Sequence, residues 1–245
     1  MKAYTQQYYA DRNHRTIHSA NEVLSVTLET LPNVQSAVDI GCGVGTWLSV
    51  LKARGVADVQ GIDGEWVDTS LLVIPPESFL KADLTKPLAV QRRFDLAISL
   101  EVAEHLPPEC AEDFVATLVR LADFVLFSAA IPHQGGRNHL NEQWQEFWAE
   151  LFSRHGYQAI DSIRGRVWDD PGIDTWYKQN TLLYVKRERL PELRNVGDVV
   201  SQKPMLSVVH PDQYLAKLHR MNSVSGSLPL FPRAIKNWVT RRFAG

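Results

Sequence analysis

A glycine-rich turn between a short apolar strand and a helix constrains the fold of this 245-residue chain more than any other feature. Residues 37–40 form an apolar strand pattern, and residues 46–54 carry apolar side chains at helical spacing. The glycines between them are Gly41, Gly43 and Gly45. Glycine adopts the unusual dihedrals of such a turn at low cost, and the free N–H groups of the following helix attract a polar or anionic ligand. The segment therefore predicts a ligand-binding strand–turn–helix unit.

The same alternation of strand and helix patterns continues through the middle of the chain. A doubly wound, Rossmann-like α/β sheet of seven strands is the expected fold, because parallel strands need helical crossovers. Ligands of such sheets bind at the carboxyl ends of the strands. The expected strands are 37–40, 59–62, 79–82, 94–100, 124–129, 157–163 and 181–185. The expected helices are 22–31, 46–54, one that starts at Pro107–Pro108, and 141–155, with Asn141 as the cap of the last.

Three regions are expected along the chain. Residues 1–29 form an N-terminal arm and helix, 30–186 the ligand-binding domain, and 187–245 a C-terminal extension with a helix over 211–221. The basic segment 230–243 has an apolar face, which we expect to dock on the domain or on a second subunit as a homodimer. A loop with acids and aromatic rings, 168–177, separates the last two strands and suits either a sugar ring or the edge of the core.

Composition excludes several classes of protein. The formal net charge is −2, which disfavours nucleic acid as the main partner. Two cysteines cannot build a disulfide scaffold or a four-cysteine zinc site. The sequence has neither an apolar run long enough to cross a bilayer nor an apolar N-terminal signal, so we expect no transmembrane segment and a cytoplasmic location.

Acidic residues at the ends of three strands narrow the kind of ligand. Asp39 precedes a Gly-x-Gly-x-Gly pattern by two residues, whereas a dinucleotide fingerprint would place glycine at Thr46. A phosphate-binding loop of the Gly-Lys-Ser/Thr type would need a lysine, which is missing here. Asp63 closes the second strand, where a carboxylate can accept from both ribose hydroxyls. Asp83 closes the third strand, where it can accept from an exocyclic amine.

This pattern resembles the class I S-adenosylmethionine-dependent methyltransferases over about residues 30–186, with DIGCGVGTW, GID, KADL and FDLAISLEVAEHL as the matching motifs. The resemblance implies that S-adenosyl-L-methionine is the cofactor and that the last strand is antiparallel. It also implies that the loop from Asp39 to Gly45 holds the methionine part of the cofactor and that Asp63 binds its ribose. By the same resemblance, Asp83 and Leu84 contact the adenine, and Glu101 and Val102 border the sulfonium. The implied cofactor residues are Asp39, Gly41, Cys42, Gly43, Gly45, Trp47, Asp63, Asp83, Leu84, Glu101 and Val102.

The methyl acceptor is expected at the loops after the fourth and fifth strands. Removal of a hydroxyl proton needs a base, and histidine is both neutral and basic near pH 7. His139 is the first candidate, with Glu142 to orient it; His133 in the same loop and His105 after the fourth strand follow. His105 also suits a plain helix-start role. The sequence shows no regular third ligand beside His133 and His139, so no metal is expected.

We therefore expect an enzyme that methylates a small polar acceptor, such as a hydroxyl of a saccharide or a related metabolite. The stretch IPHQGG…HLNEQW resembles bacterial methyltransferases, some of which are found beside surface-glycan genes. An RNA methyltransferase and a non-catalytic cofactor-binding protein are the alternatives. Against RNA stand the net charge and the residues Leu100–Ala103, which differ from an Asn/Asp-Pro-Pro-Tyr motif for exocyclic amines.

Overall fold

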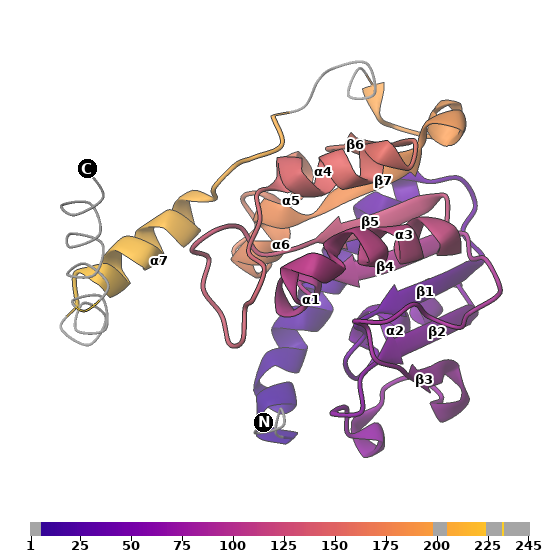
Figure 1. Ribbon diagram of the computed structural model, residues 1–245, viewed down its shortest axis with the longest axis horizontal. Coiled ribbons are helices and arrows are strands. Elements are labelled where there is room, and N and C mark those ends of the chain that lie inside the picture. The colour runs from indigo at the N-terminus through magenta and orange to yellow at the C-terminus, as the bar shows by residue number, and fades with distance from the viewer. Residues whose placement is uncertain (1–5, 198–204, 224–231, 233–245) are drawn as a thin grey trace. The chain divides into compact units, whose positions relative to one another are not determined.

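The computed structural model describes residues 6–197, 205–223 and 232, with side chains from residue 15 onward (Figure 1). The chain forms two compact units, residues 1–208 and residues 209–245. The first unit contains the sheet and every candidate site residue. None of the helices in the described part of the chain combines the length and apolarity that a bilayer crossing requires.

A seven-stranded mixed sheet forms the centre of the first unit (Figure 1). The strand order is β3-β2-β1-β4-β5-β7-β6. All pairs are parallel except those of β7, which runs antiparallel to both β5 and β6. The predicted doubly wound, Rossmann-like sheet with an antiparallel last strand is confirmed. The strands are β1 (Ser36–Ile40), β2 (Asp58–Asp63), β3 (Phe79–Lys81), β4 (Leu96–Leu100), β5 (Phe124–Ser128), β6 (Tyr157–Ile160) and β7 (Leu182–Lys186).

Helices cover both faces of this sheet and divide the core into two layers. One apolar cluster joins the sheet to α1, α2, α5 and α6, and the other joins it to α3 and α4. Each residue of β4 and β5 is buried, as expected for central strands covered on both faces. The helices are α1 (Gln6–Thr30), α2 (Thr46–Ala53), α3 (Ala111–Leu121), α4 (Gln145–Arg154), α5 (Arg164–Val167), α6 (Thr175–Asn180) and α7 (Pro211–Met221). Short 3-10 turns η1 to η5 lie at Thr69–Leu71, Pro76–Ser78, Ala103–His105, Pro108–Cys110 and Arg187–Glu192.

The first helix starts earlier than its apolar pattern indicates. The prediction was a helix over 22–31 after a polar arm, whereas α1 begins at Gln6. Ion pairs with the loop before α6 anchor part of the polar stretch: Arg15 pairs with Asp174 at 3.0 Å and His18 with Asp170 at 3.0 Å. Tertiary contacts of this kind extend a helix beyond the region that its own apolar periodicity supports.

Two further local predictions were wrong. Helix α4 starts at Gln145, and Asn141 lies upstream of it as a buried residue that accepts a hydrogen bond from Gln143 instead of capping the helix. The expected loop between the last two strands contains α5 and α6. Arg164 helps to stabilise this helical segment, because its buried guanidinium pairs with Asp161 at 2.7 Å.

The chain beyond β7 begins as part of the first unit. Arg189 of η5 pairs with Asp123 at 3.0 Å, and the backbone N–H of Arg194 donates to Thr30. The predicted helix over 211–221 is confirmed as α7, within the second unit. The basic segment 230–243 lies outside the described residues apart from Pro232.

Candidate active site

The three glycines of the turn after β1 all adopt a positive φ, between 55° and 88°. The N–H of Gly41 donates to the carbonyl of Ile62 at 2.7 Å and so ties the turn to β2. A Cβ on Gly41 would come within 2.3 Å of the Val102 side chain, and one on Gly45 within 2.8 Å of Ile74. Both the dihedrals and the close contacts therefore require glycine at these two positions.

Asp39 lies at the end of β1 with a carboxylate that the protein does not satisfy. The residue is buried, and its Oδ2 has no hydrogen-bond partner among the described residues. Burial, and then the negative charge of Asp63, raise the pKa of Asp39 well above its ordinary value. An unpaired buried acceptor is costly in the free protein, so this oxygen is suited to meet a donor from a ligand.

Asp63 is the last residue of β2, and its carboxylate contacts the glycine turn that follows β1. Its Oδ2 accepts from the N–H of Gly43 at 2.7 Å, and its Oδ1 accepts from the N–H of Gly64 at 2.6 Å. Burial raises the pKa of Asp63, although these backbone hydrogen bonds act in the opposite direction. Half-exposed Trp66 packs its indole ring over Gly64. Our sequence predictions did not include Trp66, because no motif marks an aromatic residue here.

Asp83 lies two residues beyond β3 and is more exposed than the other two acids. Its carboxylate accepts from the N–H and hydroxyl of Thr85 and pairs with Lys86 at 2.9 Å. The Thr85 hydroxyl contributes most to lowering the pKa of Asp83 to about 2. Leu84, which follows it, is buried. The Asp83 carboxylate is therefore ionised and already engaged in a local turn.

Cys42 and Trp47 are both buried in the core beside the turn. Burial raises the pKa of the Cys42 thiol, so it stays protonated and unreactive at neutral pH. The Trp47 ring lies edge-on to Tyr177 of α6, with their centroids 5.1 Å apart. These contacts link α2 to α6 beneath the turn.

A polar network surrounds Glu101 at the end of β4. Glu101 has a φ of 57°, and its two carboxylate oxygens accept from Asn180 at 3.0 Å and from Gln134 at 2.8 Å. Asn180 also donates to Gln134 at 2.9 Å. Burial raises the pKa of Glu101 while these hydrogen bonds oppose the shift. The network joins the end of β4, the loop after β5 and the end of α6. Gln134 lies next to His133 in the predicted acceptor loop but was not assigned a role, and Asn180 was absent from the sequence-based site because it lies far from it in the chain.

Glu104 follows in η3 and is almost completely buried, at 1% exposure. Neither carboxylate oxygen has a hydrogen-bond partner of good geometry within the described residues, although the backbone N–H groups of Glu104 and Ala130 lie close enough to oppose the rise in its pKa. Burial first, and the Glu101 carboxylate second, raise the pKa of Glu104 well above its ordinary value. Its backbone carbonyl accepts from the N–H groups of Leu140 and Asn141 at 2.7 and 3.0 Å, which fastens the loop after β5 to η3.

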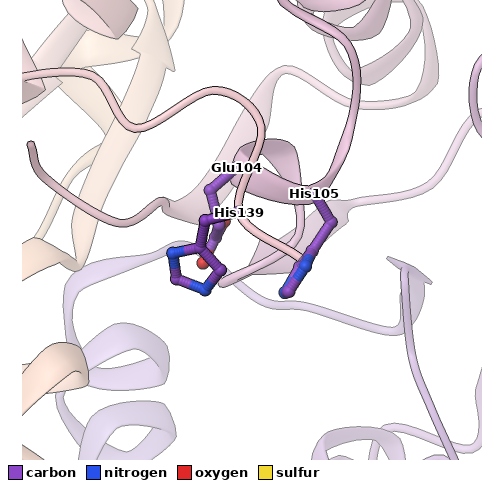
Figure 2. A group of neighbouring side chains, drawn as sticks. All are labelled: Glu104, His105 and His139. Carbon is purple, nitrogen blue, oxygen red and sulfur yellow. The ribbon is translucent and has the colours of Figure 1, made fainter. Parts of the chain in front are cut away.

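His105 and His139 meet beside Glu104 (Figure 2). Their ring centroids are 4.9 Å apart in an edge-to-face arrangement. Burial and the neighbouring His139 lower the pKa of His105, which favours its neutral form. The predicted contact of His139 with Glu142 is confirmed, because Nδ1 lies 3.0 Å from a Glu142 oxygen.

The loop after β5 presents its two histidines differently. Glu142 accepts from the N–H groups of His133 and Gly135 at 2.8 Å each, so it organises the loop backbone. The His133 side chain itself is exposed, and its φ is 67°. A Cβ on Gly136 would lie 2.0 Å from the His139 ring, so this ring packs against a position that admits no side chain. The structure brings together His139 and His105, whereas the sequence analysis paired His139 with His133.

Comparisons with known proteins agree with this geometry. Residues 9–168, more than half of the chain, match a family described as "Methyltransferase domain". A comparison with curated protein sequences finds no significant match. Among solved structures, DesVI from Streptomyces venezuelae is 14% identical with a TM-score of 0.54, covering 73% of this chain and 95% of that one.

Two further structures share the fold. Magnesium protoporphyrin IX methyltransferase (ChlM) from Synechocystis PCC 6803 with bound SAM is 20% identical, with a TM-score of 0.50 over 76% of this chain and 88% of that one. An O-methyltransferase family protein from Burkholderia thailandensis is 13% identical, with a TM-score of 0.51 over 74% of this chain and 57% of that one.

The residues at the carboxyl edge of the sheet fit the cofactor of such enzymes. The glycine turn leaves no room for side chains at Gly41 and Gly45, and Asp39 has an oxygen free for a donor. The family match and this chemistry lead to one conclusion: the chain belongs to the methyltransferase domain family, and its cofactor is S-adenosylmethionine.

Proposed function

We propose that this methyltransferase transfers a methyl group to a hydroxyl oxygen of a small polar acceptor, a saccharide or a related metabolite. The observation that carries the proposal is the position of the Glu104, His105 and His139 side chains. Glu104 and His105 follow β4, which pairs directly with β1, and His139 follows the next strand of the sheet, β5. Val102, which precedes Glu104 on the same segment, packs its side chain against the glycine turn. The acceptor side and the cofactor side of the site are thus adjacent.

The cofactor supplies a methyl group on a positively charged sulfur, which leaves as a neutral thioether. We propose that the free oxygen of Asp39 accepts from the ammonium group of the methionine part, where it finds the partner that the protein lacks. Asp63 accepts from the ribose hydroxyls with the lone pairs left available by its hydrogen bonds from Gly43, Gly64 and the Trp66 side chain. Leu84 and Asp83 border the adenine, and the hydrogen bonds of Asp83 with Thr85 fix the turn that positions them.

The acceptor oxygen gains a bond to the methyl carbon and loses its proton. We place the acceptor hydroxyl against His139 and His105, because Nδ1 of His139 is held by Glu142 and its other nitrogen is then available to the acceptor side. The hydrogen-bonded Glu101, Gln134 and Asn180 keep their side chains fixed at the border between the two ligands. Such fixed positions help to hold the reacting atoms at attack distance, which is a large part of the rate enhancement available to a transfer reaction.

Polar groups at the acceptor side suit a hydroxylated substrate, and the net charge of −2 offers no broad attraction for a nucleic acid backbone. The proposal is tested by incubating the protein with S-adenosylmethionine and a panel of monosaccharides, nucleotide sugars and short RNAs, followed by mass spectrometry. We expect a saccharide product heavier by one CH₂. Methylated RNA would overturn the acceptor class, and cofactor binding without any methylated product would support the non-catalytic alternative.

A variant of the acceptor side adds a second test. His139→Ala should reduce turnover about 100-fold while the affinity for S-adenosylmethionine changes little, because the ring contacts the acceptor side only. The exposed His155, at the end of α4, provides the matched control in His155→Ala. Equal turnover of the two variants with the true acceptor would refute the placement of the acceptor at His139.

A further inference from the structure

Three side chains from two separate loops converge beside the glycine turn (Figure 2). Glu104 and His105 come from η3 after β4, and His139 comes from the loop after β5. One potential ligand atom from each, a carboxylate oxygen and two imidazole nitrogens, lies within 4.8 Å of the other two. We propose that Glu104, His105 and His139 bind one divalent transition-metal cation, such as Mn²⁺ or Zn²⁺.

The unsatisfied state of Glu104 is the first argument. Glu104 is buried to 1% exposure, and neither of its oxygens has a hydrogen bond of good geometry within the described part of the chain, so its carboxylate carries a desolvation cost that the nearby backbone N–H groups offset only in part. Figure 2 shows this carboxylate directed toward the His139 ring. A bound cation would satisfy the oxygen that the protein leaves without a partner.

The hydrogen bond of His139 is the second argument. Glu142 lies 3.0 Å from Nδ1, and an ionised carboxylate only accepts, so the ring hydrogen is on Nδ1. The lone pair is then on Nε2, which is the form of imidazole that binds a metal. A carboxylate behind a ligating histidine is the usual outer partner in metal sites, where it fixes the tautomer and the ring orientation.

The ligand set indicates the class of cation. Two imidazoles and one carboxylate suit first-row transition metals, whereas Mg²⁺ and Ca²⁺ prefer oxygen ligands alone. With metal–ligand bonds of about 2.1 Å, ligand atoms lie about 3.0–3.4 Å apart, so binding requires a contraction of the cluster by about 1 Å or more at its widest. The loop after β5 can supply this movement, because His139 lies within a partly exposed segment.

A cation here would use the same Nε2 of His139 that the proposed function offers to the acceptor, so in the cation-bound protein His139 is a ligand and does not act as the base. It would also connect η3 with the loop after β5, whose backbone is already organised by Glu142. Cation binding does not depend on the proposed acceptor, because it can be measured without cofactor or acceptor.

The test is a titration of the purified full chain, stripped with a chelator, with Mn²⁺ followed by electron paramagnetic resonance and with Zn²⁺ followed by calorimetry. We expect one saturable site. Glu104→Gln and His139→Ala should each weaken binding by about 100-fold or more, and Glu142→Gln by about 10–100-fold as the outer partner. His155→Ala, an exposed histidine outside the cluster, should leave the affinity unchanged.

Two outcomes would overturn the site. One is the absence of one-to-one binding by the wild-type chain. The other is an affinity that Glu104→Gln and His139→Ala both leave within about twofold of wild type. If Glu104→Gln fails to fold, His139→Ala alone decides, because His139 lies in a loop and belongs to neither of the two apolar clusters of the core. One-to-one cation binding by a wild-type chain that methylates no saccharide would count against the proposed function and leave the metal site standing.

Discussion

Asp39→Asn should make the protein more stable and a weaker binder of its cofactor at the same time. The substitution keeps the shape of the side chain and removes its charge. In the free protein the buried Asp39 carboxylate has one oxygen without a partner within the described residues, and Asp63 and the Cys42 thiol are the titratable groups that face it. Leaving a buried polar group unsatisfied costs about 1–3 kcal/mol, and more when it is charged. The Asn amide is still a buried polar group, so the gain comes from removal of the buried charge. We expect about 1–3 kcal/mol, or about 2–12 °C in Tm for a chain of this size.

The gain should depend on pH with a defined sign. The pKa of Asp39 is raised in the folded state, so the folded chain holds the proton more tightly than the unfolded chain. Its stabilising contribution is therefore complete below the unfolded pKa of about 3.9 and is lost as pH rises through the folded value. The asparagine side chain does not titrate, so the Asp39→Asn variant does not lose stability in this way as the pH rises. The Tm difference between Asp39→Asn and wild type should be larger at pH 8 than at pH 5.

The assay is thermal unfolding at both pH values, together with calorimetric titration of S-adenosylmethionine. Loss of the charged acceptor should weaken cofactor binding by about 10–100-fold, since hydrogen bonds to charged groups contribute about 1.5–3 kcal/mol. The exposed Asp169 supplies the control, and Asp169→Asn should change neither property. An Asp39→Asn variant that is no more stable than wild type at pH 8, or that binds the cofactor equally well, would refute the reasoning.

Three other substitutions test separate parts of the site. Asp63→Ala should weaken S-adenosylmethionine binding by about 1–3 kcal/mol in calorimetry, and an unchanged affinity would contradict its assignment to the ribose. Gly41→Ala should lower Tm by about 4–8 °C, because the φ of 87° and the contact with Val102 both oppose a Cβ and together cost about 2 kcal/mol. A Tm within 1–2 °C of wild type would show that the alanine variant is not strained. Gly136→Ala should displace the His139 ring and reduce turnover about 10-fold or more with little change in Tm, and a fully active variant would show that the ring position is unimportant.

Sequence alone was sufficient for the sheet, and it placed two of the predicted cofactor residues near each other. Apolar strands of four to seven residues that alternate with helices leave few topologies. The acids at the carboxyl ends of β1 and β2 lie close together because parallel neighbours end at the same edge. The positions of Asp39 and Asp63 could therefore be predicted, because each ends a strand with a clear local pattern and the two strands are parallel neighbours. The start of α1 could not be predicted in this way, since Arg15 and His18 pair with residues more than 150 positions away.

The acceptor side shows where such prediction ends. His133 and His139 stand six residues apart in one loop, and nothing in their spacing tells which ring faces inward. The backbone decides, because positive φ values of 67° at His133 and 60° at Asn138 reverse the chain and leave the first histidine exposed. Glu104 meets His139 only because η3 and the loop after β5 are hydrogen-bonded through the Glu104 carbonyl. A search for metal ligands at regular sequence spacing therefore misses this cluster.

The central claim is that the methyl group of S-adenosylmethionine goes to an oxygen at the Glu104–His105–His139 side of the site. The most direct measurement uses S-adenosylmethionine with a ¹³C-labelled methyl group and follows the label by NMR in mixtures with saccharide acceptors. The carbon shift distinguishes a methyl on oxygen from one on nitrogen or carbon. We predict an O-methyl signal on a saccharide that His155→Ala retains and His139→Ala greatly reduces. A signal on nitrogen or carbon, or an O-methyl signal that His139→Ala leaves unchanged, would contradict the claim.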